Sequence, residues 1–188
     1  MHADAGAPKP DGVETFSEPA RRWFQSALGE PTRAQALAWP VLAAGESAVL
    51  MAPTGSGKTL AAFFSVLDAL SQRPEPPKKE RCKVLYVSPL KALAVDVERN
   101  LRAPIAGIAR TAEQLGVAIR IPTAEVRTGD TPTAVRTRIA RTPPDILITT
   151  PESLYLMLTS QAREVLAAVD TVIVDEIHSL VPTKRRAH

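Results

Sequence analysis

The stretch from residue 48 to residue 59, AVLMAPTGSGKT, decides the fold of this 188-residue chain. Its first five residues form an apolar run that predicts a buried strand, and residues 58–70 repeat apolar side chains at helical spacing. The octet APTGSGKT (52–59) lies between the two. Its glycines can adopt backbone angles closed to other residues, so that consecutive amides turn inward around phosphate oxygens. The stretch therefore predicts a phosphate-binding loop, or P-loop, in an α/β fold.

The side chains of this loop have distinct expected roles. The helix that begins near Lys58 offers free N–H groups and a positive dipole end to phosphate. We expect Lys58 to reach the β- and γ-phosphates of ATP and Thr59 to place its hydroxyl on Mg²⁺. Ala52 stands where the general pattern has glycine, which requires that the backbone there is not left-handed. The other expected nucleotide contacts are Pro53, Thr54, Gly55, Ser56 and Gly57.

Short apolar runs alternate with helical segments along the rest of the chain. We expect strands at 83–87, 145–149 and 171–175, with further candidates at 117–121 and 125–127. Expected helices span 18–28, 32–43, 90–101, 132–140, 151–158 and 161–168, and another follows an interruption at Pro104 and runs to 115. Continuously apolar strands separated by helices are buried on both faces. The fold class is α/β, with a mostly parallel sheet between helices.

Composition limits the remaining possibilities. A mass of 20.2 kDa suits one well-cored domain, expected at 15–188 after a disordered leader at 1–14. The N-terminus lacks the basic start and apolar stretch of a secretory signal, so a cytoplasmic protein is expected. Cys82 is the only cysteine, which excludes an internal disulfide and a thiolate zinc cluster; we expect a packed thiol. Trp23, Phe24 and Trp39 are expected to anchor the core.

An acidic pair follows the last apolar strand. Asp175 and Glu176 come directly after TVIV, at the carboxyl edge of the sheet, where nucleotides bind in such folds. Our hypothesis is that Asp175 holds Mg²⁺ while Glu176 orients and deprotonates the attacking water. His178 could be a coupling residue or a packed histidine. A role as a metal ligand is disfavoured, because the chain offers it no cysteine partners.

Positive charge is concentrated in one segment. Between Arg99 and Arg141 there are eight arginines and three acids, although the formal net charge is only +3. On charge alone, this segment is either a solvated face or a phosphate-contacting surface.

The motifs APTGSGKT (52–59) and DEIH (175–178) together resemble those of superfamily 2 DEAD/DEAH-type helicases. The longer match, over residues 16–188, is to the large helicase-related (Lhr) family of bacterial ATP-dependent helicases. The resemblance implies the first RecA-like motor domain, a three-layer P-loop NTPase fold that hydrolyses ATP to ADP and phosphate to drive strand translocation in the full-length protein. It also implies that Gln35, within WFQSALGEPTRAQALAWP (23–40), reads the adenine edge.

Three further segments resemble the family's nucleic-acid-binding motifs: SPLKALAVDVERNL (88–101), VRTGDT (126–131) and TTPESLYLML (149–158). The resemblance implies that His178 links the ATP site to this surface, that the partner is single-stranded DNA, with RNA possible, and that the protein is nucleoid-associated and serves genome repair. No membrane is implied. The implied contact residues are Ser88, Pro89, Leu90, Lys91, Arg127, Thr128, Gly129, Asp130, Thr149, Thr150, Pro151 and Glu152.

The chain also departs from the family's pattern. The sequence ends at His188, before the family's next motif and its second RecA-like domain with the arginines that complete the ATP site, and Arg186 stands where glycine is expected. We expect a C-terminally incomplete domain that binds ATP weakly and unwinds nothing alone, because transition-state stabilisation needs those arginines. A catalytically inactive nucleotide- and nucleic-acid-binding fragment remains the alternative. A small-molecule kinase is disfavoured, since it would need a substrate pocket and lid in place of the ordered motif series.

Overall fold

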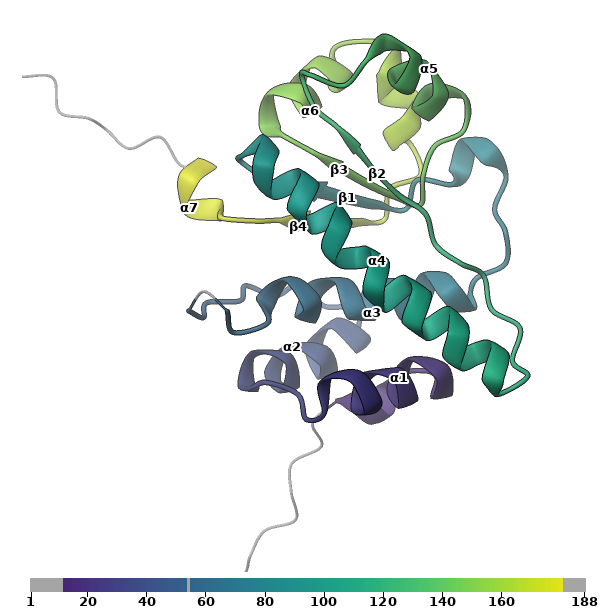
Figure 1. The fold of residues 1–188 in the computed structure, drawn as a ribbon. Coiled ribbons are helices and arrows are strands. Elements are labelled where there is room, and N and C mark those ends of the chain that lie inside the picture. Colours follow the sequence, from purple (N-terminus) through teal and green to yellow (C-terminus); the bar gives the residue numbers. More distant parts are fainter. Residues whose placement is uncertain (1–11, 54, 181–188) are drawn as a thin grey trace, which may run out of the picture. The chain divides into compact units, whose positions relative to one another are not determined.

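The computed structural model describes residues 12–53 and 55–180 (Figure 1). The described chain forms two compact units. The first comprises residues 12–72 and 104–119, and the second comprises residues 73–103 and 120–180. One long helix, α4 (Lys91–Gln114), contributes its first half to the second unit and its second half to the first. No helix in the described ranges is long and apolar enough to cross a membrane.

The first unit is helical. It contains η1 (Val13–Thr15), α1 (Glu18–Leu28), α2 (Arg33–Ala43) and α3 (Lys58–Gln72). The predicted anchors Phe24 and Trp39 are buried, and Trp23 packs against their cluster, which confirms their core role. Phe24 meets Trp39 edge to face, with ring centroids 5.1 Å apart. Val13 is 4% exposed within this core, so the expected leader at 1–14 was too long at its end; residues 1–11 lie outside the described ranges.

The second unit is built on a four-stranded sheet in the order β2-β3-β1-β4 (Figure 1). Its strands are β1 (Val84–Val87), β2 (Ala124–Arg127), β3 (Ile146–Thr149) and β4 (Thr171–Val174). Every pair is parallel, which confirms the predicted fold class. The central strands β1 and β3 are buried along their whole length, as continuous apolar runs require. Edge strand β4 departs from this expectation, because its alternate residues Val172 and Val174 are exposed.

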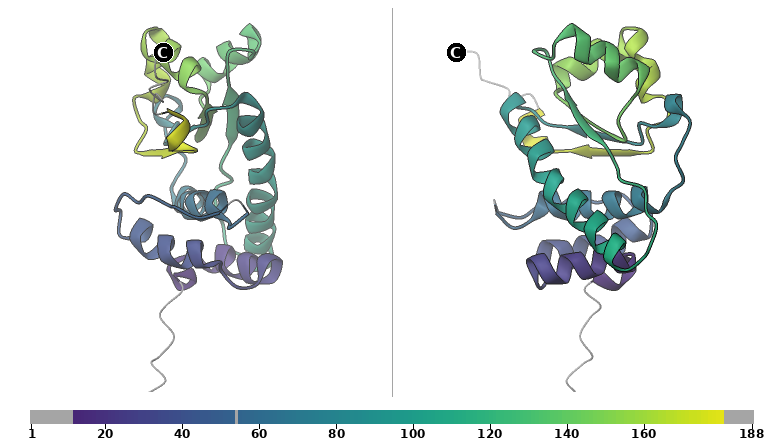
Figure 2. Two further views of the ribbon diagram at one scale, coloured as in Figure 1. Left: turned by 90° about the vertical axis from the view of Figure 1, so that its left-hand side faces the viewer. Right: turned by 45° about the vertical axis from the view of Figure 1, so that its right-hand side comes forward.

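Helical segments cover one face of this sheet. They are α5 (Thr133–Arg141), α6 (Pro151–Leu158) and η3 (Gln161–Leu166) (Figures 1 and 2). The unit also contains η2 (Lys78–Glu80) and the short α7 (Ile177–Leu180). Leu85 and Leu147 of the sheet pack in one buried cluster with Ile139, Met157 and Val165 of the covering segments.

Two expected strands are absent from the described sheet. The apolar run at 48–52 is irregular, with Val49 75% and Met51 91% exposed. An extended segment becomes a strand only where a neighbour supplies ladder hydrogen bonds, and this segment pairs with none of the four described strands. The candidate at 117–121 is likewise irregular, and pairing begins only at Ala124.

Two helix predictions also need correction. Pro104 does not interrupt the chain, and α4 passes through it as one helix. Proline removes one backbone hydrogen bond, but buried Leu101 and Ile108 on either side favour continuation. The expected α-helix at 161–168 is the tighter 3₁₀ segment η3. The other expected helices form within a residue or two of their predicted bounds.

Candidate functional site

The P-loop lies in the first unit and has the predicted glycine geometry. Gly55 and Gly57 have φ values of 80° and 81°, in the left-handed region that favours glycine. Ala52 is not left-handed, because Glu176 is the only non-glycine residue in the described ranges with a positive φ. The helix α3 begins at Lys58, directly after the turn, so its free N–H groups face the loop as anion binding requires. Thr54 lies outside the described residues.

Lys58 closes the loop on itself. Its Nζ donates to the carbonyl oxygens of Ala52 at 2.5 Å and of Pro53 at 2.9 Å. Both acceptors are neutral, so phosphate oxygens would form stronger, charge-assisted bonds with the same ammonium. Thr59, the predicted magnesium ligand, is exposed at the start of the same helix.

Gln35 is tied to this loop. It is 4% exposed, and its Oε1 accepts a 2.8 Å hydrogen bond from the backbone N–H of Thr32 in a capping box. The Thr32 hydroxyl donates to the carbonyl oxygen of Ser56 at 2.8 Å. A Cβ on Gly57 would lie 2.7 Å from Nε2 of Gln35. The structure therefore places the predicted adenine reader against the phosphate loop, with its oxygen already used and its amide nitrogen beside Gly57.

The acidic pair lies in the second unit, at the end of β4. The hydroxyl of Tyr86 donates to Oδ2 of Asp175 at 2.6 Å, and the backbone N–H of Glu176 donates to Oδ1 at 2.9 Å. Glu176 has a φ of 48°, a conformation that costs a non-glycine residue free energy and is concentrated at functional sites. His178 lies 3.3 Å from the Glu176 carboxylate through Nδ1 and is exposed, so it is not a packed histidine.

The three predicted nucleic-acid segments meet at one edge of the sheet. Because the four strands are parallel, the residues that follow them meet at the carboxyl edge in the strand order. The order across this edge is 127–130, 149–152, 88–91 and 175–176. Hydrogen bonds join neighbours: Thr149 Oγ1 donates to the Arg127 carbonyl at 2.7 Å, and Ser88 N–H donates to the Thr149 carbonyl at 2.9 Å.

Burial divides these predicted contacts into two groups. Ser88, Thr128, Thr149 and Thr150 are at most 7% exposed, and each makes a hydrogen bond inside the protein. Thr150, for example, accepts a hydrogen bond from the N–H of Ser153 and so caps α6. The exposed members, which single-stranded DNA could reach directly, are Leu90, Lys91, Gly129, Asp130 and Glu152. Pro89, Arg127 and Pro151 are intermediate.

The arginines between residues 99 and 141 differ in whether an acidic side chain already pairs with them. Arg102 pairs with Glu98, Arg138 pairs with Glu125 at 2.7 Å, and Arg120 pairs with buried Asp145. Burial, together with the positive charge of Arg136, lowers the pKa of Arg127. Part of the positive charge in this segment is therefore already paired with acidic side chains of the protein. Fewer arginines are available to a polyanion than their number in the sequence suggests.

Sequence reasoning missed two residues that shape this edge. Tyr86 orients Asp175 from β1, and Arg136 holds the loop at 128–131 through three carbonyl oxygens. The position of Arg136 five residues after Thr131 was a usable signal, because the first turn of a helix lies close to the loop that precedes it. Tyr86 gave no local signal, since its contact depends on the pairing of β1 with β4.

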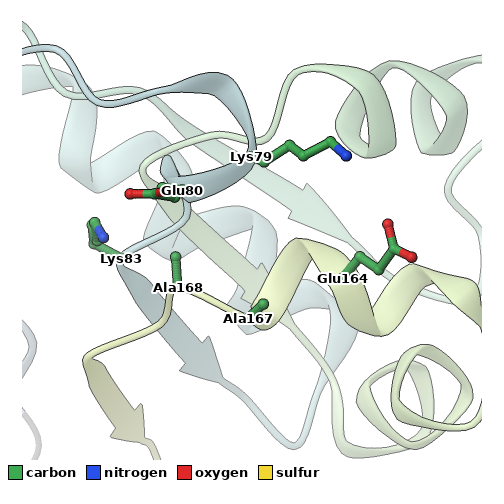
Figure 3. Close-up of a pocket in the computed structure, with 6 residues that line it drawn as sticks. All are labelled: Lys79, Glu80, Lys83, Glu164, Ala167 and Ala168. Carbon is green, nitrogen blue, oxygen red and sulfur yellow. The ribbon is translucent and has the colours of Figure 1, made fainter.

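A shallow cavity of about 570 Å³ lies elsewhere in the second unit (Figure 3). Its lining is mostly charged: Lys79, Glu80, Lys83, Glu164, Ala167 and Ala168. Lys83 precedes β1 and Ala168 precedes β4, so the cavity is at the amino ends of these strands, opposite the carboxyl edge. None of its lining residues was predicted to bind a ligand.

The donor set at the carboxyl edge fits magnesium bound together with a triphosphate. Within the described residues, no group of three or more His, Cys, Asp or Glu side chains could hold a metal ion alone. Mg²⁺ in nucleotide sites keeps waters and takes phosphate oxygens, with one or two protein ligands. Asp175 offers a carboxylate of this kind, with its other contacts fixing its orientation.

Comparison with known proteins agrees with this geometry. The DEAD/DEAH box helicase family matches residues 32–188. The chain is 54% identical over 178 residues to the Lhr helicase/probable uracil glycosylase of Mycolicibacterium smegmatis, covering 95% of this chain and 12% of that protein. It is 48% identical to the Lhr helicase/uracil glycosylase of Escherichia coli, covering 98% of this chain and again 12% of the relative.

Solved structures give the same result. The structure of Mycobacterium smegmatis helicase Lhr bound to ssDNA and AMP-PNP matches with a TM-score of 0.86 and 54% identity, over 93% of this chain and 22% of that one. The DUF1998 helicase MrfA bound to DNA and AMPPNP matches with a TM-score of 0.71 and 25% identity, over 92% of this chain and 22% of that one. The chain spans about an eighth of the length of the curated Lhr relatives. With the P-loop and the DEIH motif in place, the match shows that this chain belongs to the DEAD/DEAH box helicase family, with a RecA-like fold similar to that of Lhr.

Proposed function

We propose that this chain is the ATP-binding and nucleic-acid-binding part of the first motor domain of an ATP-dependent DNA helicase. The observation that carries the proposal is the carboxyl edge of the sheet. There, the end of β4 presents Asp175 and Glu176, and the ends of β1, β2 and β3 present the exposed polar groups of the nucleic-acid segments. One sheet thus carries both the proposed hydrolytic residues and the residues proposed to bind single-stranded DNA, as a motor requires.

The residues have separate roles in this proposal. Lys58 exchanges the carbonyl oxygens of Ala52 and Pro53 for phosphate oxygens, and the glycine turn supplies backbone N–H groups. Thr59 and Asp175 would hold Mg²⁺, which neutralises charge on the triphosphate. Glu176 accepts a proton from the attacking water, and His178, in contact with the Glu176 carboxylate, links that carboxylate to the strand-binding edge.

The nucleic-acid surface binds without reading bases. Lys91 and Arg127 supply positive charge, and exposed backbone at Gly129 and Asp130 supplies N–H groups. Such contacts recognise phosphates and set register, and they carry no sequence information. We propose single-stranded DNA as the partner because the Lhr and MrfA structures that match contain DNA. A DNA motor of this kind would act in the cytoplasm, at the nucleoid.

Nucleotide and strand binding test the proposal together. The measurement is the affinity of this chain for a fluorescent ATP analogue with Mg²⁺, with and without oligothymidylate, followed by ATP hydrolysis. We expect binding of both ligands, and hydrolysis that is slow but stimulated by the strand. Binding of both ligands with no stimulated hydrolysis would favour the alternative, a binding module without turnover. Absence of nucleotide binding would refute the proposal.

A further inference from the structure

The side chain of Arg136, on α5, grips the loop that follows β2. Its Nε donates to the carbonyl oxygen of Thr131 at 2.7 Å. Its Nη2 donates to the carbonyl oxygens of Gly129 at 2.6 Å and of Thr128 at 3.4 Å. A planar guanidinium is suited to this arrangement, because its five donors are fixed in one fork. Three of the carbonyls between residues 128 and 131 are therefore directed toward one side chain.

These hydrogen bonds also determine where the backbone N–H groups of the loop point. In a trans peptide the N–H points away from the carbonyl of the preceding residue. Since the carbonyls of Thr128 and Gly129 face Arg136, the N–H groups of Gly129 and Asp130 face away from it. Both residues are exposed, and neither N–H donates to an acceptor in the part of the chain that the structure describes. Two consecutive free amides make an anion-binding concavity.

A cation lies beside these amides. The Nζ of Lys91 is 2.7 Å from Oδ2 of Asp130, and it is 3.8 Å from the position that a Cβ on Gly129 would occupy. Both partners of this ion pair are more than half exposed, so a phosphate could replace the carboxylate at low cost. The loop thus combines neutral donors and one exchangeable charge within reach of a single anion.

We propose that Arg136 is a positioning residue for nucleic-acid binding. By holding the carbonyl of Gly129, and by sharing the carbonyl of Thr128 with the N–H of Thr131, it presents the N–H groups of Gly129 and Asp130 to one backbone phosphate of single-stranded DNA. Lys91 then turns from Asp130 to the same phosphate. This inference rests on the proposed function, and it adds that the guanidinium of Arg136 acts on the loop and not on the strand.

The alternative is that Arg136 contacts phosphate directly, as arginines on such surfaces do. The two roles differ in salt dependence. A direct contact releases counterions from the strand, so its loss lowers the slope of log affinity against log salt by about 0.7. Loss of a positioning residue removes amide contacts, which carry no net charge, while Lys91 on α4 still neutralises the phosphate, so that slope stays unchanged.

The test compares Arg136→Ala with Arg138→Ala, which removes the same charge from the same helix and breaks only an exposed pair with Glu125. Binding to fluorescent oligothymidylate is measured over a range of salt. The backbone N–H resonances of Gly129 and Asp130 are followed by NMR with and without the strand. Arg136→Lys, which keeps one donor group, is the second variant, and thermal unfolding checks that each variant is folded.

We expect Arg136→Ala to bind on the order of tenfold more weakly than Arg138→Ala with an unchanged salt slope, and Arg136→Lys to recover part of the loss. The two amide resonances should move already in the free Arg136→Ala protein and no longer respond to the strand. Equal affinity of the two alanine variants would overturn the inference, and so would a lower slope with the amide response intact. If the unaltered chain binds no strand at all, the proposed function itself fails, which is a separate outcome.

Discussion

The hydroxyl of Tyr86 donates a 2.6 Å hydrogen bond to Oδ2 of Asp175, which joins β1 to the residue directly after β4. Tyr86 is 1% exposed, and burial followed by the hydrogen bond to Asp175 raises its pKa, so the hydroxyl stays a neutral donor. The other carboxylate oxygen accepts the N–H of Glu176. Asp175 is therefore held in one orientation before any ligand arrives.

This contact predicts the effect of Tyr86→Phe. The variant keeps the packed ring and removes only the donor, so the Asp175 carboxylate gains rotational freedom. Loss of a partner that orients a metal-binding carboxylate typically lowers metal affinity by about 10–100-fold, so we expect at least tenfold weaker binding of a divalent ion with the nucleotide. Titration with Mn²⁺ in the presence of an ATP analogue measures this loss of affinity. Phe64→Leu, in the other unit, is a control for general loss of packing, and an equal effect of both would contradict the prediction.

The P-loop was the part of the site that could be predicted best. A phosphate loop needs positive φ at fixed positions, so Gly55 and Gly57 are recognisable from the sequence alone and have the expected geometry. The strand at 48–52 was wrong for a general reason. Apolar patterning reports what a segment can bury, but strand formation also needs a partner with free ladder groups, and that information lies elsewhere in the chain.

Contacts between side chains on different strands could not be predicted from the sequence motifs. The motifs placed Asp175 at a strand end, but the choice of Tyr86 as its partner follows from the register that aligns Tyr86 with Ile173. The burial of individual motif residues could not be predicted either. Ser88 and Thr149 belong to motifs expected to contact nucleic acid, yet both are fully buried, since side chains at the ends of central strands face neighbouring backbone.

A pair of glycine substitutions separates backbone strain from side-chain collision in the P-loop. Gly55 and Gly57 both have positive φ, so alanine at either position costs about 1 kcal/mol or more in strain. A Cβ on Gly55 meets no atom within 4 Å, whereas one on Gly57 would lie 2.7 Å from Nε2 of Gln35. We expect Gly57→Ala to weaken ATP binding clearly more than Gly55→Ala. Equal dissociation constants for a fluorescent ATP analogue would show that Gln35 is not positioned against the loop.

Asp145 should control the stability of the second unit. Its carboxylate is fully buried, pairs with Arg120, and accepts hydrogen bonds from the N–H and hydroxyl of Thr123 at 2.8 and 3.0 Å. Removing Asp145 leaves Arg120, whose side chain is 10% exposed, with only its 3.7 Å contact to exposed Glu75, and it also leaves the Thr123 donors without their acceptor. Breaking a buried pair in this way costs about 3–5 kcal/mol. Asp145→Ala should lower the urea midpoint accordingly. Glu75→Ala, which removes an exposed partner of the same arginine, should cost about 1 kcal/mol or less.

Cys82 gives a stability change with a defined pH window. Burial, followed by the charge of Asp145, raises the pKa of the Cys82 thiol from 9.0 to about 12. Between these values the unfolded chain has lost the proton that the folded chain keeps, so stability falls as pH rises, by up to about 1.4 kcal/mol per pH unit. Urea unfolding of the chain and of Cys82→Ala at pH 8 and pH 10.5 measures this. The difference between the two proteins should shrink or reverse at the higher pH, and a constant difference would contradict the assignment.

Glu176→Gln tests the chemistry directly. The substitution keeps the size of the side chain and its hydrogen-bonding reach, but an amide cannot accept the proton of the attacking water. General-base catalysis contributes about 10²–10⁴-fold, so strand-stimulated ATP hydrolysis should fall by at least two orders of magnitude while binding of the ATP analogue persists. The backbone adds a second comparison, because Glu176 has a φ of 48° that glycine adopts without strain. Glu176→Gly should therefore be at least as stable as Glu176→Gln and equally inactive. Hydrolysis by Glu176→Gln at the rate of the unaltered chain would remove Glu176 from the mechanism.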